Sequence, residues 1–201
     1  MLPKRESLQK IKYSETDKEI EKQVLVAKKT HALKLTNLNL KTWPKQVPIS
    51  HFLGLMIFSW AKIFTLSNLK ILDLSYNNLE EIPPEIQNLK SLSKLYLNNN
   101  PLQSVPIEIS ECRFLTLIDL SDTYVKWLPR EMALLKLLAE IRLDRCPIAS
   151  VKLQKSYQEG INSMAAYFQR KLDRSIYRVS YEMFVKVDYL IQSDRKNWQS
   201  I

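Results

Sequence analysis

Asp73 and Asp119 are the two side chains in this sequence that come nearest to a general acid–base pair. They occupy equivalent positions of a repeating pattern, on predicted strands two apart, which would place the carboxylates about 9–10 Å from each other. That separation suits acid–base chemistry, but catalysis also needs a pocket that desolvates one carboxylate. The pattern predicts an open surface with nothing to desolvate either group, and we therefore expect no catalysis.

The two cysteines fall in columns of the same pattern. Cys112 takes the position that Leu89 and Leu135 hold in neighbouring units, and Cys146 takes a position held elsewhere by asparagine. We expect buried thiols rather than a disulfide or a metal pair. His31 precedes a predicted strand and is interpreted as a structural or solvated histidine. The sequence has no glycine-rich phosphate loop and no histidine cluster, so we expect no cofactor and no metal.

The pattern that places these residues has a period of 23 residues, set by Leu69, Leu92, Leu115 and Leu138. Further columns keep the same phase: Leu72, Leu95, Ile118 and Ile141; Leu74, Leu97, Leu120 and Leu143; Asn77, Asn100, Thr123 and Cys146; Leu79, Leu102, Val125 and Ile148. Such a spacing is typical of a leucine-rich repeat. Chance does not produce several apolar columns in register over four units.

Within one unit, the alternation of Leu72 and Leu74 predicts a short strand with Asp73 and Ser75 on its opposite face. Asn77 is suited to turn the chain after that strand, and the prolines of Ile82-Pro83-Pro84 restrict the far side to extended chain or a short helical turn. One unit cannot bury its leucines alone, so neighbouring units must stack. The predicted fold class is α/β: a leucine-rich repeat solenoid with a short parallel concave sheet, an irregular convex side, and capping helices at both ends.

The chain divides into three predicted parts. Residues 1–30 form a basic segment and a capping helix from about Ser14 to Lys29, residues 31–151 form about five repeats, and residues 152–201 form a helical cap and tail. Each cap is predicted from an apolar stripe at helical spacing. The N-terminal stripe is Ile20, Val24 and Ala27; the C-terminal stripe, on a helix from Lys155 to Lys171, is Tyr157, Ile161, Met164, Ala165 and Phe168, with a second helix from Leu172 to Ile191.

An apolar block, residues 47–62, interrupts the register between the first two repeats. Without this block Pro44-Lys-Gln46 would run directly into Ile63-Phe-Thr-Leu66. Leu66 would then be in register with Leu89 of the next unit. Three interpretations stay open: an insertion that docks a partner or a membrane surface, extra core folded over the convex face, or a translated intron or alternative splice segment. The side chains for membrane or partner contact would be Phe52, Leu55, Met56, Phe58 and Trp60. The block is too short to span a bilayer.

The formal net charge of +9 is spread over both flanks and mixed with acidic residues. Because no basic stripe interleaved with aromatics is evident, we expect no specific nucleic-acid binding. Weak association with an acidic membrane surface remains an alternative. The sequence shows neither a secretory signal nor the paired cysteine caps of extracellular repeat proteins, so we expect a cytoplasmic protein.

The outward positions of the predicted concave sheet are the candidate site. Their mixture of aromatics, amides and both charge signs is typical of protein interfaces, and we expect another protein, of unknown identity, as the partner of a chain that is otherwise monomeric. Tyr76, Tyr96 and Arg142 are the expected anchors. The alternatives are solvated strand residues without a partner, a peripheral membrane-associated protein, and a structural subunit of a larger assembly. The candidate residues are Lys34, Thr36, Asp73, Ser75, Tyr76, Tyr96, Asn98, Asn99, Asp119, Asp122, Arg142, Asp144 and Arg145.

The consensus Leu-x-x-Leu-x-Leu-x-x-Asn-x-Leu-x-x-Ile-Pro at this spacing resembles the intracellular Ras-suppressor and Shoc-type leucine-rich repeats. The resemblance extends to the flanks, in Val26-Ala-Lys-Lys-Thr30 before the first strand and in Glu159-Gly-Ile-Asn-Ser-Met-Ala-Ala-Tyr-Phe after the last. It covers roughly residues 20–171. The resemblance implies a cytosolic binding module without known chemistry. The chain departs from it in having fewer repeats, in the apolar block, and in continuing past Lys171.

Overall fold

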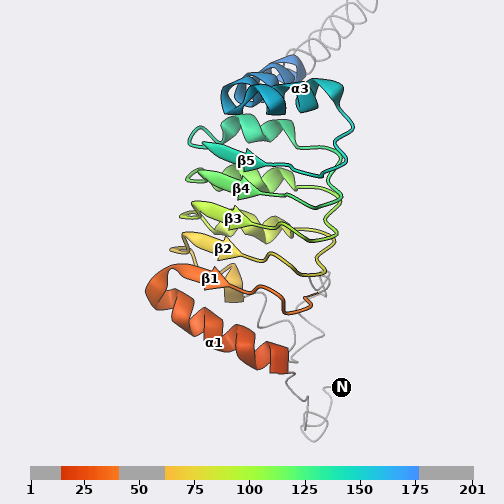
Figure 1. The fold of residues 1–201 in the computed structure, drawn as a ribbon. Helices are drawn as coiled ribbons and strands as arrows, with labels where there is room; N and C mark the ends of the chain where they lie inside the picture. The colour runs from red at the N-terminus through yellow and green to blue at the C-terminus, as the bar shows by residue number, and fades with distance from the viewer. Residues whose placement is uncertain (1–14, 41–61, 177–201) are drawn as a thin grey trace, which may run out of the picture.

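Five short strands form one parallel sheet, in the order in which they occur in the chain. The computed structural model describes residues 15–40 and 62–176. The strands are β1 (Ala32–Lys34), β2 (Ile71–Asp73), β3 (Lys94–Tyr96), β4 (Leu117–Asp119) and β5 (Glu140–Arg142), stacked one above another (Figure 1). The predicted α/β solenoid with a parallel sheet is therefore confirmed.

The central residue of each strand points into a shared core. Leu33, Leu72, Leu95, Ile118 and Ile141 are successive register partners across the sheet, and none is more than 6% exposed. The residues two positions later, including Leu74, Leu97 and Leu120, are also buried. Each repeat unit forms one coil of the solenoid. Because each strand contributes so few apolar side chains, a coil depends on its neighbours to cover them.

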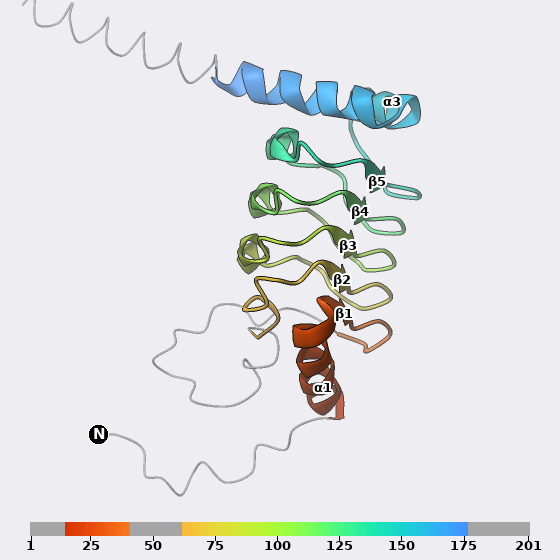
Figure 2. The ribbon, with the colours of Figure 1, turned by 90° about the vertical axis from the view of Figure 1, so that its left-hand side faces the viewer.

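A short 3-10 helix lies opposite the strand in each of three coils (Figure 2). These are η2 (Pro84–Asn88), η3 (Ile107–Glu111) and η4 (Arg130–Leu134). Each follows a proline in extended conformation, Pro83, Pro106 or Pro129, and each turns one side chain into the core, Ile86, Ile109 or Met132. The proline ring fixes the approach to the helix, as the sequence pattern predicts.

Buried asparagine amides tie successive coils together where the chain leaves the strand. The Oδ1 of Asn77 accepts hydrogen bonds from the amides of Leu38 and Leu40 at 3.0 and 3.1 Å, and its Nδ2 donates to the Leu35 carbonyl at 2.7 Å and to the Leu74 carbonyl at 2.9 Å. One side chain thus satisfies backbone groups of two coils, which would otherwise be buried without partners.

Asn100 repeats this arrangement one coil later. Its Oδ1 accepts from the Leu79 amide at 3.0 Å, and its Nδ2 donates to the carbonyls of Leu74 and Leu97 at 3.0 and 2.9 Å. In the next coils Thr123 and Cys146 take the column, and both donate to the Leu120 carbonyl, at 2.8 and 3.0 Å. Thr123 and Cys146 therefore still donate a hydrogen bond to the backbone, but neither has the side-chain amide with which asparagine both donates and accepts.

The N-terminal end of the stack is covered by α1 (Glu15–Thr30), which lies against β1 (Figure 1). Its predicted stripe, Ile20, Val24 and Ala27, is buried as expected. The chain turns directly into β1 at His31, whose backbone has a φ of 57° and whose amide bonds to the Ala27 carbonyl at 2.8 Å. His31 therefore has a structural role at the helix end, in line with its interpretation from the sequence.

The second described segment starts with a turn that matches the convex side of the later coils. The Leu66 amide bonds to the Ile63 carbonyl at 3.1 Å, as the Leu89 amide does to that of Ile86. Both Ile63 and Leu66 are buried. The predicted register of Ile63 and Leu66 is therefore confirmed. The rest of the apolar block, including Phe52, Leu55, Met56, Phe58 and Trp60, lies outside the described residues.

The C-terminal cap is divided into helices at a different residue from the one predicted. α3 (Val151–Glu159) begins at Ser150, whose side chain accepts from the Leu153 amide, and ends at Gly160, where φ is 100°. A second helical run then covers residues 161–176 without a break at Leu172. The prediction of one helix from Lys155 to Lys171 is therefore wrong, because a glycine in left-handed conformation ends a helix.

The expected apolar stripe of the cap is partly correct. Met164 and Phe168 are buried, Tyr157 and Ile161 are half-buried against the core, and Ala165 is exposed. The helix that carries Met164 and Phe168 lies across the end of the stack (Figure 2). It covers the last coil, as α1 covers the first. Residues 177–191, the rest of the predicted second helix, lie outside the described residues.

Replacing Asn100 tests the role of the buried amides. Asn100→Ala removes three hydrogen bonds to backbone groups from a side chain that is 3% exposed. We expect the free energy of unfolding, measured by urea denaturation, to fall by about 2–4 kcal/mol. Asn98→Ala, on a half-buried asparagine of the sheet face, is the matched control and should cost less than about 1 kcal/mol. Equal losses in the two variants would contradict this role.

Candidate functional site

The first predicted row of the concave face is present as a continuous line across the sheet. Lys34, Asp73, Tyr96, Asp119 and Arg142 are successive register partners at the ends of the five strands. They stand on the opposite face from the buried central residues, because side chains alternate along a strand. The sequence-based placement of this row is confirmed, whereas its binding role stays a prediction.

Two of the candidate residues are buried, which corrects the expectation for them. Asp119 and Ser75 are each 6% exposed. Asp119 accepts from the Ser121 amide at 3.0 Å, and Asp73 accepts from the Ser75 hydroxyl at 2.6 Å. The statement that nothing desolvates Asp73 and Asp119 is therefore wrong for Asp119. Both carboxylates close local turns after their strands, and this use accounts for them without catalysis.

Ion pairs within the chain occupy the C-terminal half of the face. Arg142 contacts Glu140 at 2.6 Å and Asp119 at 3.3 Å, and these two carboxylates, Glu140 first, raise the pKa of its guanidinium. Arg145 pairs with Asp122 through two hydrogen bonds, which lower the pKa of the Asp122 carboxyl. Arg142 was expected to be an anchor, but its charge is already matched inside the protein.

Asp144 is also engaged at this end. The Tyr157 hydroxyl donates to Asp144 at 3.1 Å and accepts from the Leu143 amide at 3.2 Å. Burial is the main cause that raises the pKa of Tyr157, so the phenol keeps its proton. This network joins the cap helix α3 to the last strand and fixes the C-terminal edge of the concave face.

The N-terminal half has a different chemistry, with aromatic rings and amides in place of paired charges. Tyr76 is 54% exposed, and Tyr96 is half-buried on the adjacent strand. Asn98 and Asn99 are half-buried beside them, and Thr36 continues the surface toward α1. Rings and amides lose less hydration than charges when a partner covers them. This half of the face is therefore the part best suited to burial in an interface.

The positions three residues after the end of each strand share an unusual backbone conformation that the sequence reasoning missed. The φ angles all lie between 56° and 59° at these positions, which are Asn37, Tyr76, Asn99, Asp122 and Arg145. Asparagine and aspartate tolerate this left-handed region, but tyrosine and arginine rarely adopt it. The asparagines at positions 37 and 99 were the feature of the sequence from which this backbone conformation could have been predicted. Tyr76 is thus held in a conformation unfavourable for its type.

One further row on this face was overlooked. Ile71, Lys94, Leu117 and Glu140 begin their strands and flank the buried central residues on the other side. Lys94 and Glu140 are exposed, while Leu117 is buried at the surface of the sheet. The alternation that singled out Asp73 applies equally to the residue before Leu72, and it would have identified this row.

The cysteines behave largely as predicted. Cys112 is fully buried and its thiol donates to the Ile86 carbonyl at 3.2 Å, and burial raises the pKa of that thiol to about 12. Cys146 is half-buried beside Thr123, with its sulfur 3.4 Å from the hydroxyl oxygen. Both are free thiols. Across residues 15–40 and 62–176 no group of acidic, histidine or cysteine side chains is arranged to hold a metal ion.

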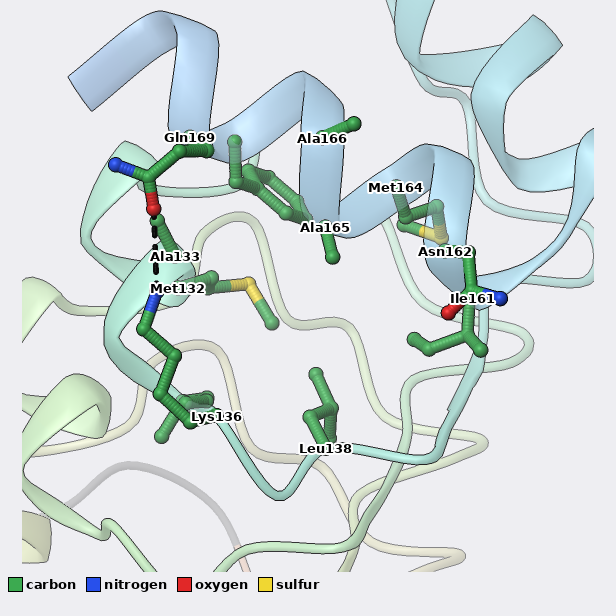
Figure 3. A pocket seen from close by; sticks show the side chains of 12 residues that line it. Met132, Ala133, Lys136, Leu138, Ile161, Asn162, Met164, Ala165, Ala166 and Gln169 are labelled. Carbon is green, nitrogen blue, oxygen red and sulfur yellow. Dashed lines mark hydrogen bonds between the residues drawn. The ribbon is translucent and has the colours of Figure 1, made fainter. Parts of the chain in front are cut away.

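A hollow of about 330 Å³ lies between η4 and the helix of residues 161–176 (Figure 3). Met132, Leu138 and Met164 line it, and Lys136 donates to Gln169 at 3.1 Å across it. Met132 and Met164 are buried, so the hollow is the seam along which the cap packs on the last coil.

No helix in the described part of the chain has the length and apolar character needed to cross a membrane.

One family model and several solved structures are similar to this chain. The leucine rich repeat family model matches residues 60–102. No curated protein matches the chain. A leucine-rich repeat protein of Leptospira interrogans is similar over 60% of this chain and 33% of its own, with 26% identity and a TM-score of 0.45.

Two plant structures are also similar. The BIR2 ectodomain from Arabidopsis thaliana has 26% identity and a TM-score of 0.41, covering 55% of this chain and 52% of its own. The plant peptide hormone receptor RGFR1, solved in complex with RGF2, has 35% identity and a TM-score of 0.37, covering 41% of this chain and 14% of its own. The chain thus spans about half or less of these proteins. Its own register and the family match show that the described residues form a leucine-rich repeat solenoid.

The left-handed conformation of Tyr76 predicts a stabilising substitution. Tyr76→Asn places at φ 57° the residue type that occupies the equivalent positions 37 and 99. We expect the free energy of unfolding to rise by about 0.5–1 kcal/mol in urea denaturation, because backbone strain is relieved. The reciprocal change, Asn99→Tyr, should lower it by a similar amount. A less stable Tyr76→Asn variant would show that the ring contributes more to the fold than the strain costs.

The raised pKa of Cys112 predicts a protected thiol. At pH 8 its thiolate fraction is very small, because burial lifts the pKa to about 12. In a Cys146→Ser variant, where Cys112 is the remaining cysteine of the two in the chain, reaction with a disulfide reagent should be at least about a hundredfold slower in the native protein than in urea. Equal rates in the two conditions would mean that the thiol is accessible in the folded state.

Proposed function

We propose that this protein is a non-catalytic interaction module that binds one partner protein on the N-terminal half of its concave face. Leucine-rich repeat solenoids generally present an extended concave surface to other proteins. The observation that supports the choice of this half is Tyr76, an exposed aromatic ring on a left-handed backbone where asparagine would fit with less strain. Strain that persists at a surface position is a recurrent property of binding sites.

The neighbours of Tyr76 support the same assignment. Tyr96 lies on β3, next to Asp73 of the strand that precedes Tyr76, and the backbone carbonyl of Asn98 accepts a hydrogen bond from the Tyr76 amide at 3.0 Å. The two rings can supply apolar contact area and the amides directed hydrogen bonds, at a low cost in side-chain entropy. The ion pairs of Arg142 and Arg145 would form a charged rim that is already neutralised.

We also propose that this interaction module belongs to a particular kind of repeat protein. The consensus and the flanking motifs support an intracellular adaptor of the Ras-suppressor and Shoc type, most similar to leucine-rich repeat-containing protein 57. A cytoplasmic signalling scaffold fits the free thiols of Cys112 and Cys146, because a reducing compartment keeps such thiols unpaired.

Site-specific photo-cross-linking in cells tests this proposal. A photoreactive phenylalanine analogue is placed at Tyr76 or, as a control of similar exposure away from the concave face, at Phe114, which is 60% exposed. We expect a discrete adduct from position 76 that is about tenfold stronger than any from position 114. The adduct should disappear when Tyr96→Ser is added, while the urea midpoint stays within the range of the parent protein. Equal labelling from both positions would contradict the proposed face.

A further inference from the structure

A groove of about 400 Å³ opens at the C-terminal end of the stack, on a different side from the concave face. One wall is the connection between β4 and η4, with Lys126, Trp127 and Arg130. The other wall is the helix of residues 161–176, with Tyr167 and Lys171. The groove therefore exists because the cap closes over the last coil without covering this connection.

The walls of the groove carry two aromatic rings. Trp127 is 63% exposed, an unusual state for the largest apolar side chain. Tyr167 is half-buried, with its hydroxyl 3.3 Å from the Ser150 hydroxyl, and buried Leu153 also lines the groove. This arrangement offers a partly apolar slot in which one aromatic or aliphatic side chain can be buried between Trp127 and the cap helix.

The charged side chains that line the groove are positive. Lys171 lies 5.7 Å from the centre of the Tyr167 ring, and Arg130 pairs with Glu131 at 3.0 Å while its side chain stays 49% exposed. In the described part of the chain no carboxylate forms an ion pair with Lys126 or Lys171. These two lysines line the same groove as the exposed ring of Trp127.

The repeat itself does not require this cluster. At the positions of Lys126 and Trp127, the two preceding coils have Glu80-Glu81 and Gln103-Ser104, and at the position of Arg130 they have Pro84 and Ile107. The core is equally well formed in all three coils. The change from acidic to neutral to basic and aromatic is therefore a property of the last coil and not of the fold.

We propose that this groove is a second binding site, which takes an acidic peptide segment of a partner protein with an aromatic or aliphatic side chain among its carboxylates. The ring of Trp127 and the slot beside it would bury the apolar side chain. Lys126 and Lys171 would pair with the flanking carboxylates, and the net charge of +9 would favour the approach of an acidic segment. A hollow with one apolar slot fits a peptide side chain better than a flat surface.

Fluorescence anisotropy with a labelled peptide tests the site. The probe is a peptide of glutamates around one central phenylalanine, and its control has glutamine in place of every glutamate. Two variants adopt the residues of the preceding coil, Lys126→Gln and Trp127→Ser. We expect the acidic probe to bind the full chain at low ionic strength and the double variant to raise its Kd about tenfold. Lys70→Gln, an exposed lysine in another coil, should change the Kd less than about twofold.

Three results would overturn this inference. One is a glutamine control that binds as well as the acidic probe. Another is a double variant that retains the parent affinity while its urea midpoint is unchanged. A greater loss of binding to phosphatidylserine vesicles or to single-stranded polynucleotide, caused by the same two substitutions, would assign the groove to a lipid or a nucleic acid. The test is separate from the concave face, because Tyr96→Ser should leave the affinity for the acidic probe unchanged.

Discussion

The amide of a buried asparagine is the interaction on which the rest of this structure depends. Each coil buries too few leucines to be stable by itself, and the turn that follows its strand leaves backbone groups without partners. Asn77 and Asn100 satisfy those groups in two coils at once. This bonding holds neighbouring turns in one orientation and so presents the residues after the strands in regular rows. The concave face is a consequence of that constraint.

The same constraint explains how the two halves of the face differ. Toward the C-terminus the asparagine is replaced by Thr123 and then Cys146, and ion pairs between neighbouring coils appear in the same region. Arg142–Asp119 and Arg145–Asp122 each connect adjacent coils across the surface. Toward the N-terminus the amides hold the turns together, and the surface carries tyrosines and asparagines. The half whose turns are held by buried amides therefore has the surface that a partner can dehydrate at lower cost.

Much of this architecture could be predicted from the sequence, because a period of 23 residues fixes which side chains share a column. The strand centres, the first row of the concave face, the buried Cys112 and the register of Ile63 and Leu66 all follow from that period. Other features depend on backbone torsions that a column of side chains does not reveal. Gly160 splits the cap in place of the expected break near Lys171, and Tyr76 adopts a left-handed turn. Asp119 is buried and pairs with Arg142 of the neighbouring strand, a contact between coils that the column of a single residue does not reveal.

The most direct test of the account is hydroxyl-radical footprinting of the unmodified protein with and without the partner that cross-linking identifies. Tyr76 and Tyr96 report on the N-terminal half of the concave face, and Phe114 reports on a similarly exposed ring elsewhere. We expect the oxidation rate of both tyrosines to fall several-fold when the partner is bound, because an interface anchor is buried. The oxidation rate of Phe114 should stay unchanged. Protection of Phe114 with both tyrosines still reactive would contradict it and would move the binding surface away from the sheet.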